Sequence, residues 1–310
     1  MQVSVYFGSY RHKDPDKFLK LLKDAGLNAI DFSLENAWER PKFWQAILPD
    51  DNFFMHSDEE VLGYYKPLVE KIKSYGIDLF QGHAPFPSGV PDRPHTIKYA
   101  NEVIKRSVDI AAKIGIKNFV IHGSSLFGWD KVNSLEDIDN MNWELYSQLA
   151  STLKGTNTVV CLEDMFADID GIPIKGHGTN AKDTADMIDK LNALCDGETH
   201  FGYCLDIGHM TLAGVDVYPF IKTLGKRITC LHIHDNFGGY KDSHALPYFA
   251  SMDYKDFLQG LKDVGYDGAI NFEVDPLAKV PEELYPDILK LVYKTGEYFY
   301  KAIKGLEPIK

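Results

Sequence analysis

Short apolar runs alternate with longer helix-like segments from one end of the chain to the other. A run such as Val3–Phe7 is continuous and ends at a turn, which is typical of a strand buried on both faces of a parallel sheet. The following segment, Pro15–Ala25, has the character of a helix closed by Gly26. The eight predicted strands are Val3–Phe7, Asn28–Phe32, Ile77–Gln81, Lys117–Ile121, Thr158–Leu162, Phe201–Leu205, Arg227–Leu231 and Gly268–Phe272.

Each predicted strand precedes a predicted helix. Ser57 and Glu60 have the spacing of a capping box at the start of the second helix, and Gly76 ends it. The predicted helices are Pro15–Ala25, Ser57–Tyr75, Pro94–Ile114, Asn142–Leu153, Thr179–Leu194, Asp216–Leu224, Tyr254–Val264 and Pro281–Lys304.

Eight such units in succession predict an α/β protein with a parallel sheet covered by helices. A chain of 310 residues fits a single (β/α)8 TIM barrel, which typically has about 250 residues plus insertions. An open doubly wound sheet is the alternative, but no Gly-rich phosphate-binding fingerprint follows the first strand. No linker or low-complexity tract divides the chain, so we expect one domain over residues 1–310.

An aromatic, charged insertion, Trp38–Phe54, follows the second strand. Its mixed periodicity indicates a loop with short helical pieces over one end of the barrel. Packing under a loop is the expected role of most of its rings, ahead of ligand contact.

The formal net charge is −12 and the sequence pI is about 5.4. Such a surface repels phosphate backbones on average, so no nucleic-acid partner is expected. The start of the chain lacks a signal peptide's basic and apolar segments, and no run approaches the roughly 20 apolar residues of a membrane span. The cysteines, which form no C-x-x-C pair, are expected to be reduced thiols in a cytoplasmic protein. They are Cys161, Cys195, Cys204 and Cys230.

Metal-ligand side chains end six consecutive predicted strands, from the third to the eighth. The carboxyl ends of barrel strands form one rim, so these residues are expected to meet in space. Carboxylates and imidazoles together suit a divalent cation such as Zn²⁺, Mn²⁺ or Mg²⁺. The residues at the strand ends are His83, His122, Glu163, Asp206, His232 and Glu273, and the following connections add His209, Asp242 and His244.

Each of these residues also has a simpler interpretation. A single histidine beside a glycine is typical of a hydrogen-bonded structural imidazole, and an acidic residue after a strand is typical of a helix N-cap. We expect His234 to point to the other side of its strand from His232 and to support or pack. Surface or capping roles are expected for the remaining histidines, which are His56, His95, His177 and His200.

At these residues the sequence resembles the xylose isomerase-like TIM barrel superfamily. Its members include sugar and sugar-phosphate isomerases, epimerases, inosose dehydratases and endonuclease IV (AP endonuclease family 2). The motifs that carry the resemblance are Gly82-His83-Ala84-Pro85, Ile121-His122-Gly123-Ser124, Leu162-Glu163-Asp164, Leu205-Asp206-Ile207-Gly208-His209, His232-Ile233-His234-Asp235-Asn236, Asp242-Ser243-His244 and Phe272-Glu273.

The resemblance to ketose 3-epimerases implies one divalent ion, held by Glu163, Asp206, His232 and Glu273. It also implies that Glu163 and Glu273 transfer the proton on opposite faces of a sugar carbon, through an enediolate that the metal stabilises, while His209 contacts the substrate. The implied partner is a small sugar, polyol or sugar phosphate.

The resemblance to endonuclease IV implies a different activity, that of a phosphodiesterase that acts on abasic DNA with three zinc ions. Its additional ligands would be His83, His122, His209, Asp242 and His244. The strand-end loops show no obvious run of basic and wedge-like apolar residues for bending DNA. The only basic side chains in the loop Ala167–Thr179 are Lys175 and His177. A barrel that binds carbohydrate without catalysis is a third hypothesis.

The sequence departs from many members after His244, where a Gly-x-Gly pair is replaced by a segment containing Tyr248 and Phe249, which we expect to narrow the site. Rim aromatics would either stack on a sugar or pack in the core; they are Phe7, Phe86, Phe127, Trp129 and Phe237. The substrate, its phosphorylation, the choice between epimerisation, isomerisation and dehydration, the metal, and the oligomeric state, a homo-oligomer included, stay open.

Overall fold

Eight parallel strands form the centre of the protein. The computed structural model covers residues 1–310, and the structure describes all of them except 8–13, 35–36, 91, 125–134, 239–240 and 279. The strands of the main sheet are β1 (Val3–Tyr6), β2 (Ala29–Asp31), β3 (Asp78–His83), β4 (Asn118–His122), β5 (Val159–Glu163), β8 (Phe201–Asp206), β9 (Ile228–His232) and β10 (Ile270–Phe272).

The sheet closes on itself. Its order is β10-β1-β2-β3-β4-β5-β8-β9, and every pairing is parallel. The two ends meet just beyond β9, where the N–H of Ile233 donates to Asn271 O at 3.0 Å and the N–H of Glu273 donates to Ile233 O at 3.2 Å. The predicted (β/α)8 barrel is therefore confirmed.

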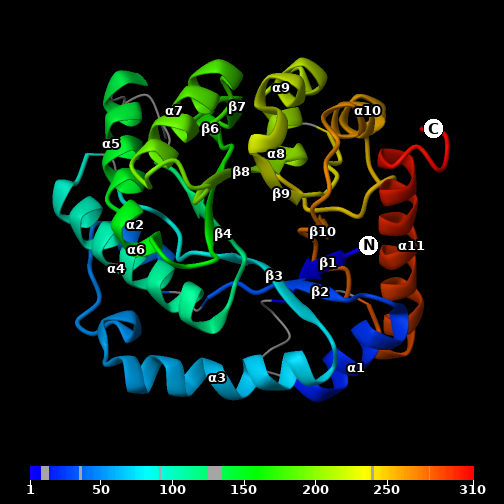
Figure 1. Ribbon diagram of the computed structural model, residues 1–310, viewed down its shortest axis with the longest axis horizontal. Coiled ribbons are helices and arrows are strands. Elements are labelled where there is room, and N and C mark those ends of the chain that lie inside the picture. The colour runs from blue at the N-terminus through cyan, green and yellow to red at the C-terminus, as the bar shows by residue number, and fades with distance from the viewer. Residues whose placement is uncertain (8–13, 35–36, 91, 125–134, 239–240, 279) are drawn as a thin grey trace.

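Helices encircle the strands, and α1 and α11 lie side by side where the chain's first and last helices meet (Figure 1). Both Pro15–Ala25 and Pro94–Ile114 have the predicted bounds, and the capping box of Ser57 and Glu60 is present. The helices are α1 (Pro15–Ala25), α2 (Arg40–Trp44), α3 (Asp58–Ser74), α4 (Pro94–Ile114), α5 (Leu135–Ser147), α6 (Ala150–Leu153), α7 (Ala181–Ala193), α8 (Ile207–Leu212), α9 (Val217–Leu224), α10 (Lys255–Val264) and α11 (Tyr285–Ile303), with 3-10 turns at Phe53–Met55, Gly225–Arg227 and Glu282–Leu284.

The helix predicted at Asn142–Leu153 is in fact two helices. The first, α5, starts at Leu135 with acidic residues in its first turn, which favours a helix N-terminus. Asn142 lies inside it and uses its side chain to hold both backbone groups of Ser124, at 2.6 and 3.0 Å. The tie fixes the segment that follows β4 against α5.

A hairpin stands where the sequence predicts a loop after Glu163. Its antiparallel strands are β6 (Phe166–Ile169) and β7 (Ile172–Lys175), joined by Asp170 and Gly171. Both turn residues have positive φ, 53° and 81°, as a two-residue hairpin turn requires. The Asp-Gly pair is the sequence feature that could have predicted the hairpin.

The barrel lumen changes character along its length. A small apolar cluster includes Cys161, Cys204 and Cys230, all fully buried free thiols. Each lies two residues before Glu163, Asp206 or His232 on the same strand, and residues two apart on a strand share a face. The thiols therefore form the layer below the polar strand ends, whereas the larger core packs strands against helices.

The aromatic insertion packs as expected. Trp38 stacks on Phe43 with ring centroids 4.4 Å apart, and both are buried in the main core. The indole N–H of Trp38 donates to Phe86 O at 3.1 Å, which ties the insertion to the segment after β3.

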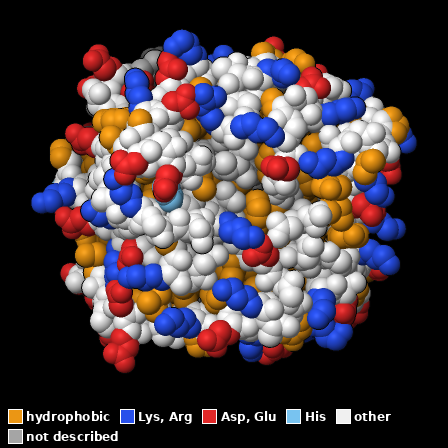
Figure 2. Space-filling view, in the orientation of Figure 1, with side chains coloured by type: hydrophobic (Ala, Val, Ile, Leu, Met, Phe, Trp, Pro, Cys, Tyr) orange, Lys and Arg blue, Asp and Glu red, His pale blue; other side chains and the backbone are white. Residues whose placement is uncertain are grey.

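On the face shown in Figure 2, basic and acidic side chains of the described residues are intermingled rather than sorted into single-sign areas. Each helix within the described part of the chain is too short or too polar to cross a membrane.

Two of the histidines expected to have surface or capping roles are buried. His200 is 5% exposed, with Nδ1 3.3 Å from Thr158 O. His177 is 9% exposed beside the Tyr146 ring, and its Nε2 has no hydrogen-bond partner within the described ranges of the chain. Burial lowers the pKa of His177 to about 4. Neither burial follows from the local sequence, because the packing elements are distant along the chain.

We predict that His177 destabilises the fold in acid. Its pKa is lower in the folded chain than in the unfolded one, so its contribution is intact above pH 6.5 and is lost as the pH falls towards 4. The His177→Gln variant should therefore gain unfolding free energy relative to wild type over this range, by roughly 3 kcal/mol. Urea denaturation at several pH values measures the difference.

The control is His56→Gln. Asp51 raises the pKa of the exposed His56, so its removal should shift relative stability in the opposite direction as the pH falls. A constant difference between His177→Gln and wild type from pH 7 to pH 4 would contradict the prediction.

Candidate metal centre

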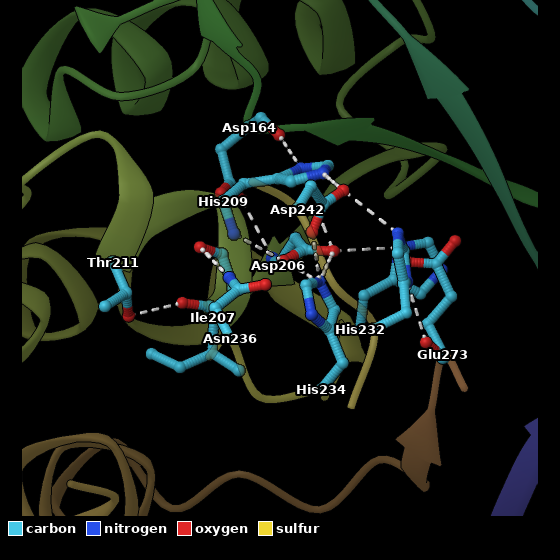
Figure 3. A network of polar contacts seen from close by, with 12 residues as sticks. Asp164, Asp206, Ile207, His209, Thr211, His232, His234, Asn236, Asp242 and Glu273 are labelled. Atoms are coloured by element: carbon cyan, nitrogen blue, oxygen red, sulfur yellow. Dashed lines mark hydrogen bonds and ion pairs between the residues drawn. The ribbon is translucent and has the colours of Figure 1, made fainter. Parts of the chain in front are cut away.

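Side chains from several strand ends gather around the imidazole of His232, the last residue of β9. Its Nδ1 lies 2.7 Å from Glu163 Oε1, 3.6 Å from Glu273 Oε2 and 3.8 Å from Asp206 Oδ2. Figure 3 shows Asp206, Glu273 and His232 turned towards one another. The structure thus brings together the four residues expected to share an ion.

The position of Asp206 has a local cause. It ends β8 and is also the N-cap of α8, where its Oδ1 accepts the N–H of His209 at 2.8 Å. The backbone N–H of Asp206 itself donates to Asp164 Oδ1 at 2.9 Å. Capping and presentation of Oδ2 to His232 are therefore two uses of one carboxylate.

Negative charge is concentrated here. Glu163, Asp164 and Asp206 are fully buried, and the Glu273 side chain is 17% exposed. Burial opposes ionisation, but the charges of His122 and His232 hold the pKa of Glu163 well below its usual value. Burial raises the pKa of Asp164, as does the neighbouring charge of Asp206.

The arrangement fits a divalent cation. Ligands about 2.1 Å from a tetrahedral ion lie roughly 3.4 Å from one another, close to the separations around His232 Nδ1. In addition, Glu163 Oε2 and Glu273 Oε2 are buried and make no well-aligned hydrogen bond within the described part of the chain, although imidazole nitrogens lie 2.6 and 3.6 Å from them. Buried carboxylate oxygens are normally paired or bound to metal, so an ion would satisfy both.

A second group shares Glu163. His122 Nε2 lies 2.6 Å and His83 Nε2 3.4 Å from Glu163 Oε2, and these three atoms are close enough together to hold an ion. The two imidazoles meet edge to face at 4.7 Å, and neither ring nitrogen of His122 makes a well-aligned hydrogen bond to a described residue.

A third set of side chains lies on the other side of Asp206. His209 Nε2 is 3.4 Å and His244 Nε2 2.9 Å from Asp242 Oδ2. His209 Nδ1 lies 2.9 Å from Asp164 O, which leaves Nε2 facing Asp242. Burial opposes protonation of His244, but its bond to Asp242 raises the pKa to about 10. All nine predicted residues therefore occupy one continuous polar region.

The expected orientation of His234 is wrong. His232 and His234 are two residues apart, and the period of a strand puts both on the same side. His234 Nε2 lies 3.0 Å from Asp206 Oδ1, so the predicted supporting contact exists, but inside the cluster. Its ring lies against Gly208, where an added Cβ would be 1.9 Å from His234 Cε1.

Asp235 fixes the wall of the site that follows β9. Its carboxylate accepts four backbone N–H groups at 2.8 to 3.2 Å, and its own backbone pairs with Ala245 in both directions. That pairing places the adjacent His244, whose φ of 44° is unusual for a residue with a side chain, towards Asp242. The four donors belong to Asn236, Ala250, Ser251 and Met252.

Three residues of the region are absent from the predicted site. Asp31, at the end of β2, lies 3.2 Å from His232 Nε2. Asp164 orients His209, and Phe166 of the hairpin approaches the His209 ring at 5.4 Å. The sign that could have revealed Asp31 is its place at the end of the second apolar run.

The rim aromatics have different surroundings. Phe86 lies 4.7 Å from the His122 ring, at the site, whereas Phe7 is a fully buried core residue and Phe237 is 69% exposed. Phe127 and Trp129 lie outside the described residues. Of the two residues expected to narrow the site, Tyr248 packs its ring on Tyr254, Tyr298 and Phe299, and Phe249 is 61% exposed.

The fold and this region define a TIM barrel whose strand ends carry side chains able to hold a divalent cation. The model of the family described as "Xylose isomerase-like TIM barrel" matches residues 19–294, and the chain belongs to that family. The resemblance noted in the sequence is confirmed.

Among curated proteins, the chain is 27% identical over 217 residues to the uncharacterized protein MJ1311 of Methanocaldococcus jannaschii, covering 67% of this chain and 68% of that one. It is 25% identical over 176 residues to the uncharacterized protein y4fM of Sinorhizobium fredii, covering 56% of this chain and about half (51%) of that one.

Among solved structures, D-psicose 3-epimerase of Clostridium cellulolyticum H10, bound to D-tagatose, superposes with a TM-score of 0.68 at 14% identity, covering 96% of this chain and 99% of that one. An L-ribulose 3-epimerase gives a TM-score of 0.68 at 15% identity, covering 99% and 97%. At such identities the likeness is one of fold.

The contact of Gly208 with His234 gives a test of the cluster's packing. We predict that Gly208→Ala destabilises the protein by about 1–3 kcal/mol, because the new methyl group displaces the ring that holds Asp206. Once the His234 ring is gone, the added methyl group has space. Gly208→Ala should therefore cost less unfolding free energy in the His234→Ala background than in wild type. Chemical denaturation of the four proteins in this double-mutant cycle measures the coupling.

The matched control is Gly63→Ala in α3, where a Cβ would have nothing within 4 Å. That variant should be as stable as wild type or more stable, since alanine favours a helix. Additive effects of the Gly208 and His234 substitutions would show that the two residues do not compete for space.

Proposed function

We propose that the protein is a divalent-metal-dependent isomerase or epimerase of a small sugar, polyol or sugar phosphate. The observation that carries the proposal is the placement of Glu163, Asp206 and Glu273 around one nitrogen of His232. Family membership and the folds of the 3-epimerases support a carbohydrate substrate.

Glu163, Asp206, His232 and Glu273 would hold the cation, with Zn²⁺, Mn²⁺ and Mg²⁺ as candidates. When bound, the ion acts as a Lewis acid on oxygens of the substrate. Glu163 from β5 and Glu273 after β10 reach His232 from different strands, so they flank the space above it. One carboxylate takes the proton from the carbon next to the carbonyl, and the other returns a proton on the opposite face.

The surrounding residues complete the site. His209, fixed through Nδ1 by Asp164, offers Nε2 to a substrate hydroxyl. The rings of Phe86 and Phe166, next to His122 and His209, cover the polar cluster and would limit the access of water to the reacting carbon.

We predict that Glu163→Gln and Glu273→Gln each lower turnover by roughly 10²–10⁴-fold, because each removes one proton-transferring group. The assay is incorporation of deuterium from D2O into candidate ketoses such as D-tagatose, D-psicose and L-ribulose, followed by NMR. Both variants are assayed at saturating metal, with bound metal measured in parallel, because both glutamates are also proposed ligands.

Glu136→Gln, an exposed position on α5, is the matched control and should exchange like wild type. A metal-loaded Glu163→Gln or Glu273→Gln protein with wild-type turnover would exclude the proposed acid–base role.

A phosphodiesterase with three zinc ions, acting on abasic DNA, is the second candidate. The observation that favours it is the group of His83, His122 and Glu163, whose ligand atoms converge apart from His232. His209, Asp242 and His244 offer a further set of contacts. The acidic net charge of −12 disfavours it.

Metal stoichiometry separates the candidates. For the epimerase or isomerase we predict about one tightly bound ion per chain by elemental analysis, a count unchanged in His83→Ala, and no cleavage of an abasic duplex. About three ions per chain, with one lost in His83→Ala, together with strand cleavage, would instead establish the second candidate.

A further inference from the structure

Asp31 supports His232 from the side opposite the candidate metal centre. It ends β2, three places from β9 around the closed barrel, and its side chain reaches into the lumen. Asp31 Oδ2 lies 3.2 Å from His232 Nε2, while the other nitrogen of the ring, Nδ1, faces Glu163, Asp206 and Glu273. Both residues are fully buried.

Two amides hold the Asp31 carboxylate in place. Gln81 Nε2 of β3 donates to Asp31 Oδ2 at 3.1 Å, and Asn271 Nδ2 of β10 donates to the same atom at 3.5 Å. Gln81 Nε2 also lies 3.4 Å from Leu231 O, on the strand that carries His232. The carboxylate is therefore surrounded by donors from strands on both sides of it.

This arrangement costs folding free energy, because it buries polar atoms away from water. Asp31 Oδ1, Gln81 Oε1, Asn271 Oδ1 and Ser4 Oγ are all buried, and none of them has a hydrogen-bond partner among the residues that the structure describes. An apolar layer, like the one that Cys161 and Cys204 form in the same lumen, would avoid burying these atoms. The side chain that gains from the carboxylate is His232.

We propose that Asp31 is a positioning residue that fixes the ring orientation and tautomer of His232. An ionised carboxylate only accepts hydrogen bonds, so it keeps a proton on Nε2. A metal ion binds the neutral form of the ring, whose lone pair is then on Nδ1, directed at the space between the three carboxylates. A carboxylate that binds the second nitrogen of a metal-ligating histidine acts in this way.

Glu163 makes the support necessary. Its Oε1 lies 2.7 Å from His232 Nδ1, where it competes for the same ring proton. Without Asp31, neutral His232 would place its proton on Nδ1 towards Glu163 and its lone pair on Nε2, away from the cluster. The inference rests on the proposed metal site, but it does not depend on which sugar is the substrate.

The experiment compares Asp31→Asn with wild type and with Asp78→Asn, the matched control. Asp78 starts β3 at the other end of the barrel, where it pairs with Lys117 and Gln2. Chelator competition gives the dissociation constants of Mn²⁺ and Zn²⁺ for the three folded proteins. Asp31→Asn should bind about 10–100-fold more weakly, whereas Asp78→Asn should bind like wild type.

A second measurement needs no substitution at Asp31. Imidazole ¹⁵N shifts of the metal-loaded wild type, assigned with His232→Gln, should show His232 protonated on Nε2 and metal-bound through Nδ1. This readout separates positioning from general stabilisation, since a purely structural Asp31 would lower the melting temperature and leave metal affinity and tautomer unchanged.

The outcomes distinguish the two proposals. Equal metal affinity of folded Asp31→Asn and wild type, or an Nδ1-protonated His232 in the loaded protein, overturns the role of Asp31 alone. A wild-type chain that binds none of Mn²⁺, Zn²⁺ and Mg²⁺ overturns the proposed function and this inference together. Metal binding with the expected loss, but without activity on any sugar, supports the role of Asp31 and contradicts the proposed function.

Discussion

The mutual repulsion of buried carboxylates is the constraint on which the site depends. Glu163, Asp164 and Asp206 lie within the same barrel mouth without solvent, and Glu273 is nearly covered. The imidazoles of His122 and His232 lie 2.6 and 2.7 Å from the Glu163 carboxylate and offset its charge, so the pKa of Glu163 stays low despite its burial. A cation at this point would act in the same direction and would bind carboxylate oxygens that make no well-aligned hydrogen bond to any described residue.

The barrel supplies what these charges need, which is a rigid frame. Six of the nine ligand-type side chains are at or next to a strand end, and the strands are joined to one another by parallel hydrogen bonds around a closed sheet. The other three, His209, Asp242 and His244, lie in the connections that follow β8 and β9. Below the polar mouth, the thiol layer of Cys161, Cys204 and Cys230 is small and apolar. The lower part of the lumen is thus packed with apolar side chains, and the polar side chains lie at the C-terminal ends of the strands. This is how TIM barrels separate the residues needed for stability from those needed for function.

The barrel and the nine polar residues were accessible from the sequence because they depend on local patterns. Apolar runs that stop at a histidine or an acid mark a strand end without any knowledge of the rest of the fold. The helix bounds of α1 and α4 were likewise set by Pro at the start and Gly after the end.

The missed features depend on contacts between distant segments. Asp31 becomes relevant only because β2 and β9 face the same lumen, and His177 is buried by elements that its own neighbours do not reveal. Two other errors were local. Asp170-Gly171 is a residue pair typical of a two-residue hairpin turn, so the hairpin could have been predicted. The two-residue period of a strand likewise puts His234 on the same side as His232.

The carboxylate of Asp235 has a consequence for how a ligand enters. The carboxylate accepts hydrogen bonds from four backbone N–H groups of the segment after β9. These hydrogen bonds hold the backbone of Asn236 and of Ala250–Met252 in place on that side of the barrel mouth. Ligand entry would then depend on other parts of the barrel mouth, among them the β6–β7 hairpin between β5 and β8, where the Phe166 ring lies 5.4 Å from the His209 ring.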